Sequence, residues 1–308
     1  MRPLPSLART VSCLAFLAAV SSCARTSSEQ PPQPKPPVEF LGEWGTRGDG
    51  PGQLKLPSAL ATDAYGSVYV ADRESRFINK FDANGRPLLA FELPGRGAAQ
   101  SIAVDSGDAI YVGESNGRIS IFLPDGGHLR TLWRLHAPPD ALAVDPDGNI
   151  FSMCSSGTLQ KLSPRGRSLG IWGNEQGSNR LFTSPVGLGL SQDGSLYVAD
   201  RGSHSIQKLS SMGELTASWP LPAGGNGESP ILVSLTTFRN LLFLLTLQQG
   251  QYTLSVWSAE GRLILSDQLG GRLLPHVGSE FRIAASPKGE LLILDPTAAR
   301  ILRFRINL

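Results

Sequence analysis

Short apolar segments recur along the chain, each directly after a turn. The clearest two are SVYVAD at 67–72 and SLYVAD at 195–200. Weaker versions read AIYVGE, NIFSMC, LLFLLT and ELLILD. The preceding turns are anchored at Gly66, Asp108, Gly148, Gly194, Asn240 and Gly289, and these residue types suit the positive φ of tight hairpins. Runs of this length between turns predict β-strands.

The spacing of these turns indicates the architecture. Consecutive anchors lie 40 to 49 residues apart, which is the spacing of four-stranded β-propeller blades. A second turn recurs in most units, near Gly85, Gly126, Gly166, Gly213 and Gly261, where it would join the third and fourth strands. We therefore predict an all-β fold over residues 38–308, a six-bladed β-propeller of four-stranded antiparallel blades.

The two ends of this region predict how the ring closes. The last unit ends at Leu308 without a fourth strand, whereas the first residues, VEFLGEWG at 38–45, are surplus. They match the fourth-strand segment RSLGIWG at 167–173. We expect the N-terminal strand to complete the last blade, because closure removes open sheet edges.

Two long segments, 41–81 and 169–209, share a Leu-Gly-x-Trp-Gly start, a polar loop, a proline and a turn followed by Tyr-Val-Ala-Asp. These motifs resemble NHL repeats, and the resemblance extends over essentially all of 38–308. It is strongest in the first and fourth units and poorest in the fifth. It implies the same six-bladed fold.

The N-terminal residues predict export. Arg2 and Arg9 precede a short apolar run at 11–20, which is followed by Val-Ser-Ser-Cys ending at Cys23. This arrangement is similar to the lipobox of bacterial lipoproteins, and it implies a signal peptide at 1–22 and a lipid on Cys23. Residues 23–37 are rich in proline and poor in apolar residues, as in an extended tether.

The residue after Cys23 is Ala24 rather than aspartate, so the resemblance implies an exported lipoprotein of the cell envelope, at the outer membrane. Ordinary secretory cleavage that leaves Cys23 free is the alternative. Processing would remove Cys13, so that Cys154 alone remains for the folded domain and no disulfide can form within it. We interpret Cys154 as a buried structural thiol rather than a nucleophile.

Charge excludes one class of partner. Without residues 1–22 the chain would hold 26 basic and 26 acidic residues, whereas a broad nucleic-acid surface needs a basic excess. We expect no nucleic acid among the partners. A protein, a peptide or another envelope component is expected instead, with the membrane reached through the lipid on Cys23.

Binding residues are expected on one rim, where loops join the second and third strands and connect successive blades. The rim candidates are Arg73, Arg76, Glu114, Asp140, Arg201, His204 and Arg282. We place the channel mouth near Ser58, Gln100, Ser101, Asp140 and Arg282. The arginines could accept an anion or form rim salt bridges, whereas Asp72 and Asp200 are interpreted as acceptors of backbone N–H groups.

We predict no catalytic residue, metal ligand or cofactor. Calcium-dependent lactonases of the gluconolactonase type share six blades, but the asparagine of their Ser-Asn-Gly-Leu motif is absent from the matching stretch, SPVGL at 184–188. Streptogramin lyases are also similar, yet their Glu-x-His group does not occur. The expected function is a non-enzymatic binding or scaffold module; a metal-dependent hydrolase or lyase is the alternative.

Overall fold

The computed structural model describes residues 35–75, 77–132, 135, 137–173, 181–223, 227–270, 273–274 and 280–308. The predicted signal peptide at 1–22, Cys23 and most of the tether lie outside these residues. None of the described residues forms a helix that is long and apolar enough to cross a membrane.

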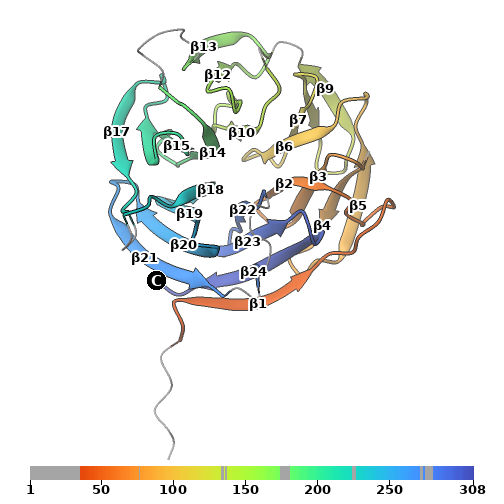
Figure 1. The fold of residues 1–308 in the computed structure, drawn as a ribbon. Helices are drawn as coiled ribbons and strands as arrows, with labels where there is room; N and C mark the ends of the chain where they lie inside the picture. Colours follow the sequence, from red (N-terminus) through yellow and green to blue (C-terminus); the bar gives the residue numbers. More distant parts are fainter. Residues whose placement is uncertain are drawn as a thin grey trace, which may run out of the picture. The chain divides into compact units, whose positions relative to one another are not determined.

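Residues 35–308 form a compact unit in which six antiparallel sheets of four strands surround an axis (Figure 1). Blade 1 contains β2 (Pro57–Thr62), β3 (Val68–Asp72), β4 (Phe77–Phe81) and β5 (Pro87–Glu92). Blade 2 contains β6 (Ala99–Val104), β7 (Ile110–Glu114), β8 (Ile119–Phe122) and β9 (His128–Leu132). Blade 3 contains β10 (Ala141–Val144), β11 (Ile150–Met153), β12 (Leu159–Leu162) and β13 (Ser168–Trp172).

Blade 4 contains β14 (Pro185–Leu190), β15 (Leu196–Asp200), β16 (Ser205–Leu209) and β17 (Leu215–Pro220). Blade 5 contains β18 (Ile231–Phe238), β19 (Leu241–Gln248), β20 (Gln251–Ser258) and β21 (Leu263–Leu269). Blade 6 contains β22 (Arg282–Ala285), β23 (Glu290–Asp295), β24 (Arg300–Ile306) and, from the other end of the sequence, β1 (Val38–Trp44). The predicted fold is confirmed.

The closure of the ring is also confirmed. Strand β1 pairs with β24 in antiparallel register, with Val38 opposite Ile306, and the two strands lie side by side at the outer edge of the ring (Figure 1). Ion pairs reinforce this seam, including one between Glu39 Oε2 and Arg305 Nη1 at 3.0 Å. Strand β1 therefore supplies the fourth, outer strand of blade 6.

The core lies between blades rather than at one centre. Among the described residues, each of six apolar clusters joins two neighbouring blades around the ring. In three blades a tryptophan from the preceding fourth strand packs on the glycine of the third-to-fourth turn, where an added Cβ would collide with the indole ring. These pairs are Trp44 with Gly85, Trp172 with Gly213, and Trp219 with Gly261.

One turn differs from the sequence prediction. The anchors at Gly66, Asp108, Gly148, Gly194 and Gly289 have positive φ. At the fifth, Arg239 takes a φ of 55° instead of Asn240. Strands β18 and β19 are joined by only two residues, because Phe238 pairs with Leu241, and this shorter turn moves the left-handed position one residue earlier.

Candidate functional site

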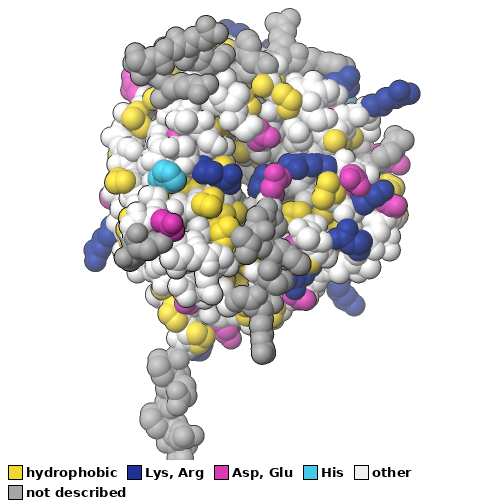
Figure 2. Space-filling view, in the orientation of Figure 1, with side chains coloured by type: hydrophobic (Ala, Val, Ile, Leu, Met, Phe, Trp, Pro, Cys, Tyr) yellow, Lys and Arg dark blue, Asp and Glu magenta, His cyan; other side chains and the backbone are white. Residues whose placement is uncertain are grey.

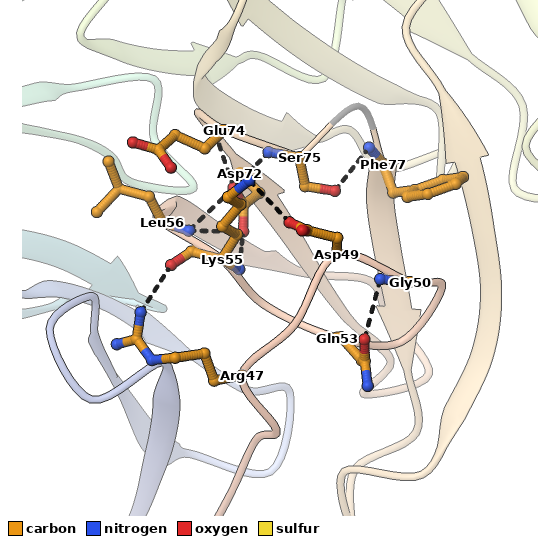
Figure 3. A network of polar contacts seen from close by, with 10 residues as sticks. All are labelled: Arg47, Asp49, Gly50, Gln53, Lys55, Leu56, Asp72, Glu74, Ser75 and Phe77. Atoms are coloured by element: carbon orange, nitrogen blue, oxygen red, sulfur yellow. Dashed lines mark hydrogen bonds and ion pairs between the residues drawn. The ribbon is translucent and has the colours of Figure 1, made fainter.

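The first set of polar side chains at the rim holds the loops of the propeller in place. Asp72, at the end of β3, is fully buried. Its carboxylate accepts N–H groups from Lys55 at 2.7 Å and Ser75 at 2.8 Å, and further ones from Leu56 and Glu74 (Figure 3). It therefore holds the loop that enters blade 1 against the loop that follows β3.

Asp200 does the same in blade 4. It is also fully buried, and it accepts N–H groups from Ser184 at 2.6 Å and Thr183 at 3.1 Å. A buried carboxylate needs such donors because its desolvation is otherwise costly. Both aspartates are therefore occupied by the protein's own backbone, as interpreted from the sequence.

Glu114, at the matching position of blade 2, requires a correction. It was expected on the open rim, but it is fully buried, and its Oε1 accepts the hydroxyl of Ser120 at 2.6 Å. The carboxylate points toward β8, because a serine donor is available there. Glu114 thus stabilises its own blade rather than facing a ligand.

The second set of polar side chains surrounds a cavity. A cavity of about 470 Å³, which we call the mouth cavity, is lined by residues of blades 1, 3, 4, 5 and 6. Its charged residues are Arg73, Asp140, Arg201, Glu280 and Arg282. Figure 2 views the molecule along the axis of the ring. Basic and acidic side chains lie close together near the centre of the visible face.

The mouth cavity adjoins the central channel. The channel is a cavity of about 290 Å³ lined by the first strands of all six blades. Asp140 and Arg282 line both cavities, and Asp140 is the only carboxylate among the described residues of the channel wall. Of the five residues predicted near the channel mouth, Asp140 and Arg282 lie where the two cavities join, Ser101 lines the channel, and Ser58 and Gln100 line neither cavity.

Hydrogen bonds and ion pairs hold the charged side chains in place. Glu280 Oε2 lies 3.0 Å from Arg73 Nη1 and 3.9 Å from Arg282 Nη2. Arg201 Nε donates to the carbonyl of Leu232 at 3.0 Å. Asp140 accepts the N–H of Ser155 at 2.6 Å. The mouth cavity thus has a built polar wall rather than scattered surface charges.

Burial lowers the pKa of Arg282, and the neighbouring Arg73 and Arg201 act in the same direction, while Glu280 and Asp140 oppose them. A guanidinium nevertheless stays protonated, because its ordinary pKa is above 12. Arg282 is therefore a positive charge at the junction of the cavities, and an anion near it would be favoured.

Blade 5 supplies an apolar wall that the sequence reading missed. Ile231, Val233, Leu247 and Tyr252 line the mouth cavity. Strands β18, β19 and β20 have eight residues each, longer than the corresponding strands of the other blades. The long apolar run at 241–247 was a signal of this extension, but a weak repeat gave no register with which to place it.

Among the described rim candidates, His204 lies away from the mouth cavity. It is exposed and takes a φ of 50°. Arg76, like His136 and His276, lies outside the described residues. Cys154 is a buried free thiol on the cavity wall, with its Sγ 2.9 Å from Ser156 Oγ. Within the described part of the chain, no three His, Cys, Asp or Glu side chains form a group suited to a metal ion.

These features define a six-bladed β-propeller with a polar-walled cavity at one end of its channel. The model of the NHL repeat matches residues 182–209, which extend from the loop before β14 to the end of β16. The chain is thus a six-bladed β-propeller whose fourth blade matches the model of the NHL repeat. No curated protein matches the sequence.

Solved structures share the fold. A streptogramin B lyase is 17% identical, with a TM-score of 0.56, and the match covers 88% of this chain and 98% of the lyase. The WD40 repeats of RRP9 are 12% identical, with a TM-score of 0.61 and coverage of 86% and 97%. A protein of unknown function from Bacteroides caccae is 14% identical, with a TM-score of 0.53 and coverage of 69% and 81%. At these identities the likeness concerns the fold alone.

Proposed function

We propose that this protein is a lipid-anchored, non-enzymatic binding module of the bacterial cell envelope. It captures a protein, a peptide or another envelope component at the mouth cavity. Cys23 carries the lipid, and residues 23–37 form the tether that holds the propeller away from the outer membrane.

One observation carries the binding role: three arginines and an apolar wall, from four different blades, surround one cavity. Its volume of about 470 Å³ lies within the usual range of ligand pockets, about 300–1,000 Å³. Concave sites with an apolar wall and a few fixed polar groups are typical of binding sites. The loops that carry Arg73 and Arg201 are held by Asp72 and Asp200, so the site is preorganised.

A metal-dependent hydrolase or lyase has less support. Hard cations in proteins are held by several oxygen ligands, and the described channel wall supplies only the carboxylate of Asp140, already bonded to the Ser155 N–H. The streptogramin B lyase likeness is a likeness of fold, and one fold serves many chemistries.

The binding role is tested by cross-linking the full-length chain to its neighbours in bacterial envelopes. The double variant Arg73→Ala, Arg201→Ala should lose the cross-linked products that the unchanged protein forms. The matched control is Arg86→Ala, Arg262→Ala, in turns between third and fourth strands at the opposite end of the blades; it should keep them. Retention of all products by the first variant would overturn the assignment of the mouth cavity.

The anchor has a separate test. Mass spectrometry of the full-length chain expressed in bacteria should find acyl groups on Cys23 as the first residue. Cys23→Ala should move the protein from the membrane fraction to the soluble envelope fraction, because one or more buried acyl chains provide the membrane affinity. An unmodified thiol on Cys23 in the exported protein would exclude the lipid.

A further inference from the structure

The lining of the mouth cavity combines apolar side chains with guanidinium groups. Blade 5 contributes the apolar side, where Ile231 is 46% exposed although it belongs to a strand. Three arginines from blades 1, 4 and 6 line the same cavity: Arg73, Arg201 and Arg282. An apolar side chain left half open beside guanidinium groups indicates a ligand with an apolar body and an anionic end.

A carboxylate already lies among these arginines. Glu280 Oε2 is within ion-pair distance of both Arg73 and Arg282, so their geometry suits a carboxylate. The Glu280 side chain is 63% exposed, and an exposed ion pair contributes only about 0–1 kcal/mol. A carboxylate from a ligand can therefore replace it at little cost.

Two further observations concern the charge of the ligand. Arg73 Nε is buried and has no hydrogen-bond partner among the described residues, so this guanidinium keeps an unsatisfied donor. Three arginines face the carboxylates of Asp140 and Glu280 in the same cavity, so one positive charge has no counterpart. Asp140 would repel a second negative charge, and a single carboxylate is therefore favoured over a phosphate dianion.

We infer that the mouth cavity binds a monocarboxylate with a short apolar side chain, whose carboxylate replaces that of Glu280 between Arg73 and Arg282. This inference rests on the proposed binding function and gives its ligand class. The terminal residue of a peptide and a free aliphatic acid share this chemistry.

The experiment is calorimetric titration of the full-length chain with N-acetyl-leucine, which represents a peptide terminus, and with hexanoate, which represents a free acid. N-acetyl-leucinamide is the matched neutral probe and should bind at least about tenfold more weakly, because it lacks the charge that a guanidinium fork recognises. Tighter binding of N-acetyl-leucine than of hexanoate would indicate a peptide terminus, and the reverse order a free acid.

Three variants test the placement of the carboxylate. Glu280→Gln should tighten binding of the preferred acid about fivefold, because the competing carboxylate is gone. Arg282→Gln and Arg73→Gln should each weaken it by about fivefold or more. Glu260→Gln, in the third-to-fourth turn of blade 5 and away from the cavity, is the matched control and should change nothing.

Several results would overturn the inference: equal binding of the amide, weaker binding by Glu280→Gln, or tighter binding of inorganic phosphate than of either acid. Absence of binding by both acids would also overturn it. If the acids fail while Arg73→Ala, Arg201→Ala still abolishes envelope cross-links, the binding function stands and the ligand class is wrong. If the cross-links also persist, both proposals fail.

Discussion

Blades 4 and 5 are neighbours in the ring but use the same position differently. Blade 4 ends its second strand with Asp200, whose carboxylate is occupied by backbone N–H groups. Blade 5 has Thr246 there, and its Oγ1 donates to the carbonyl of Thr253. The blade that shows the repeat most clearly uses the repeated residue as scaffold. The blade that shows it least supplies the apolar wall of the mouth cavity.

The largest effect on stability is expected when blade 5 receives the aspartate that blade 4 has at this position. In Thr246→Asp, a carboxylate would face the carbonyl oxygen of Thr253, and an acceptor cannot pair with an acceptor. We expect a loss of about 4 kcal/mol in the free energy of unfolding, as for an unpaired buried charge, measured by urea denaturation. The control is Thr246→Asn, since asparagine has the shape of aspartate but carries N–H donors. This variant should be clearly more stable than Thr246→Asp. Equal stability of Thr246→Asp and the unchanged protein would contradict this account of blade 5.

The converse change removes the scaffold contact from blade 4. Asp200→Ala leaves the N–H groups of Thr183 and Ser184 without their acceptor, and each such buried loss costs about 1–3 kcal/mol. We expect about 3 kcal/mol of destabilisation in the same assay. The exposed Glu74→Gln should have almost no effect. A destabilisation below 1 kcal/mol for Asp200→Ala would mean that the carboxylate does not hold the loop.

Blade 3 offers an intermediate case, since Cys154 directly follows its second strand. Its thiol lies near Ser156 Oγ and the carbonyl of Thr158, and a serine hydroxyl can replace both contacts. Cys154→Ser should therefore cost less than about 1 kcal/mol. A loss as large as that of Asp200→Ala would show that sulfur packing, rather than hydrogen bonding, dominates at this position.

The smallest effect depends on pH. In the turn before β15, the Ser191 hydroxyl, followed by the Ser195 N–H, lowers the pKa of Asp193 below its ordinary value; the turn at Arg239 and Asn240 in blade 5 has no carboxylate. A depressed pKa in the folded state adds stability above the unfolded pKa, and this is lost as pH falls through the folded value. Asp193→Asn should thus remove a small part, below about 1 kcal/mol, of the stability lost between about pH 5 and 3.

Urea denaturation at several pH values measures this effect. The unchanged protein should lose slightly more stability toward low pH than Asp193→Asn does. Identical slopes in the two proteins would show that the turn does not favour the ionised carboxylate.

Much of the fold could be predicted from the sequence because the repeated units can be aligned with one another. Turn glycines such as Gly66 and Gly194 set the register, and the surplus segment around Phe40 could be matched to a missing strand. The scaffold role of Asp72 and Asp200 followed from their presence in the two best copies of the repeat.

The site was less predictable, because its residues do not repeat. Arg73, Asp140, Arg201 and Arg282, predicted for one rim, all line the mouth cavity, but the pairing of Glu280 with two arginines depends on distances between blades. Glu114 was expected on the open rim but is buried, because its carboxylate accepts hydrogen bonds from Ser120 Oγ and Asn116 Nδ2. The wall formed by Ile231 and Tyr252 depends on extra strand length in the least regular blade.

The seam between β1 and β24 also sets the order of events during translation. Glu39 and Arg305 form an ion pair although they are 266 positions apart. At about 5–20 residues per second, the ribosome needs on the order of tens of seconds to produce the partner strand. Throughout this interval β1 lacks its partner strand β24, and unpaired strands promote association between chains. A nascent propeller of this kind therefore depends on protection until its last strand is made.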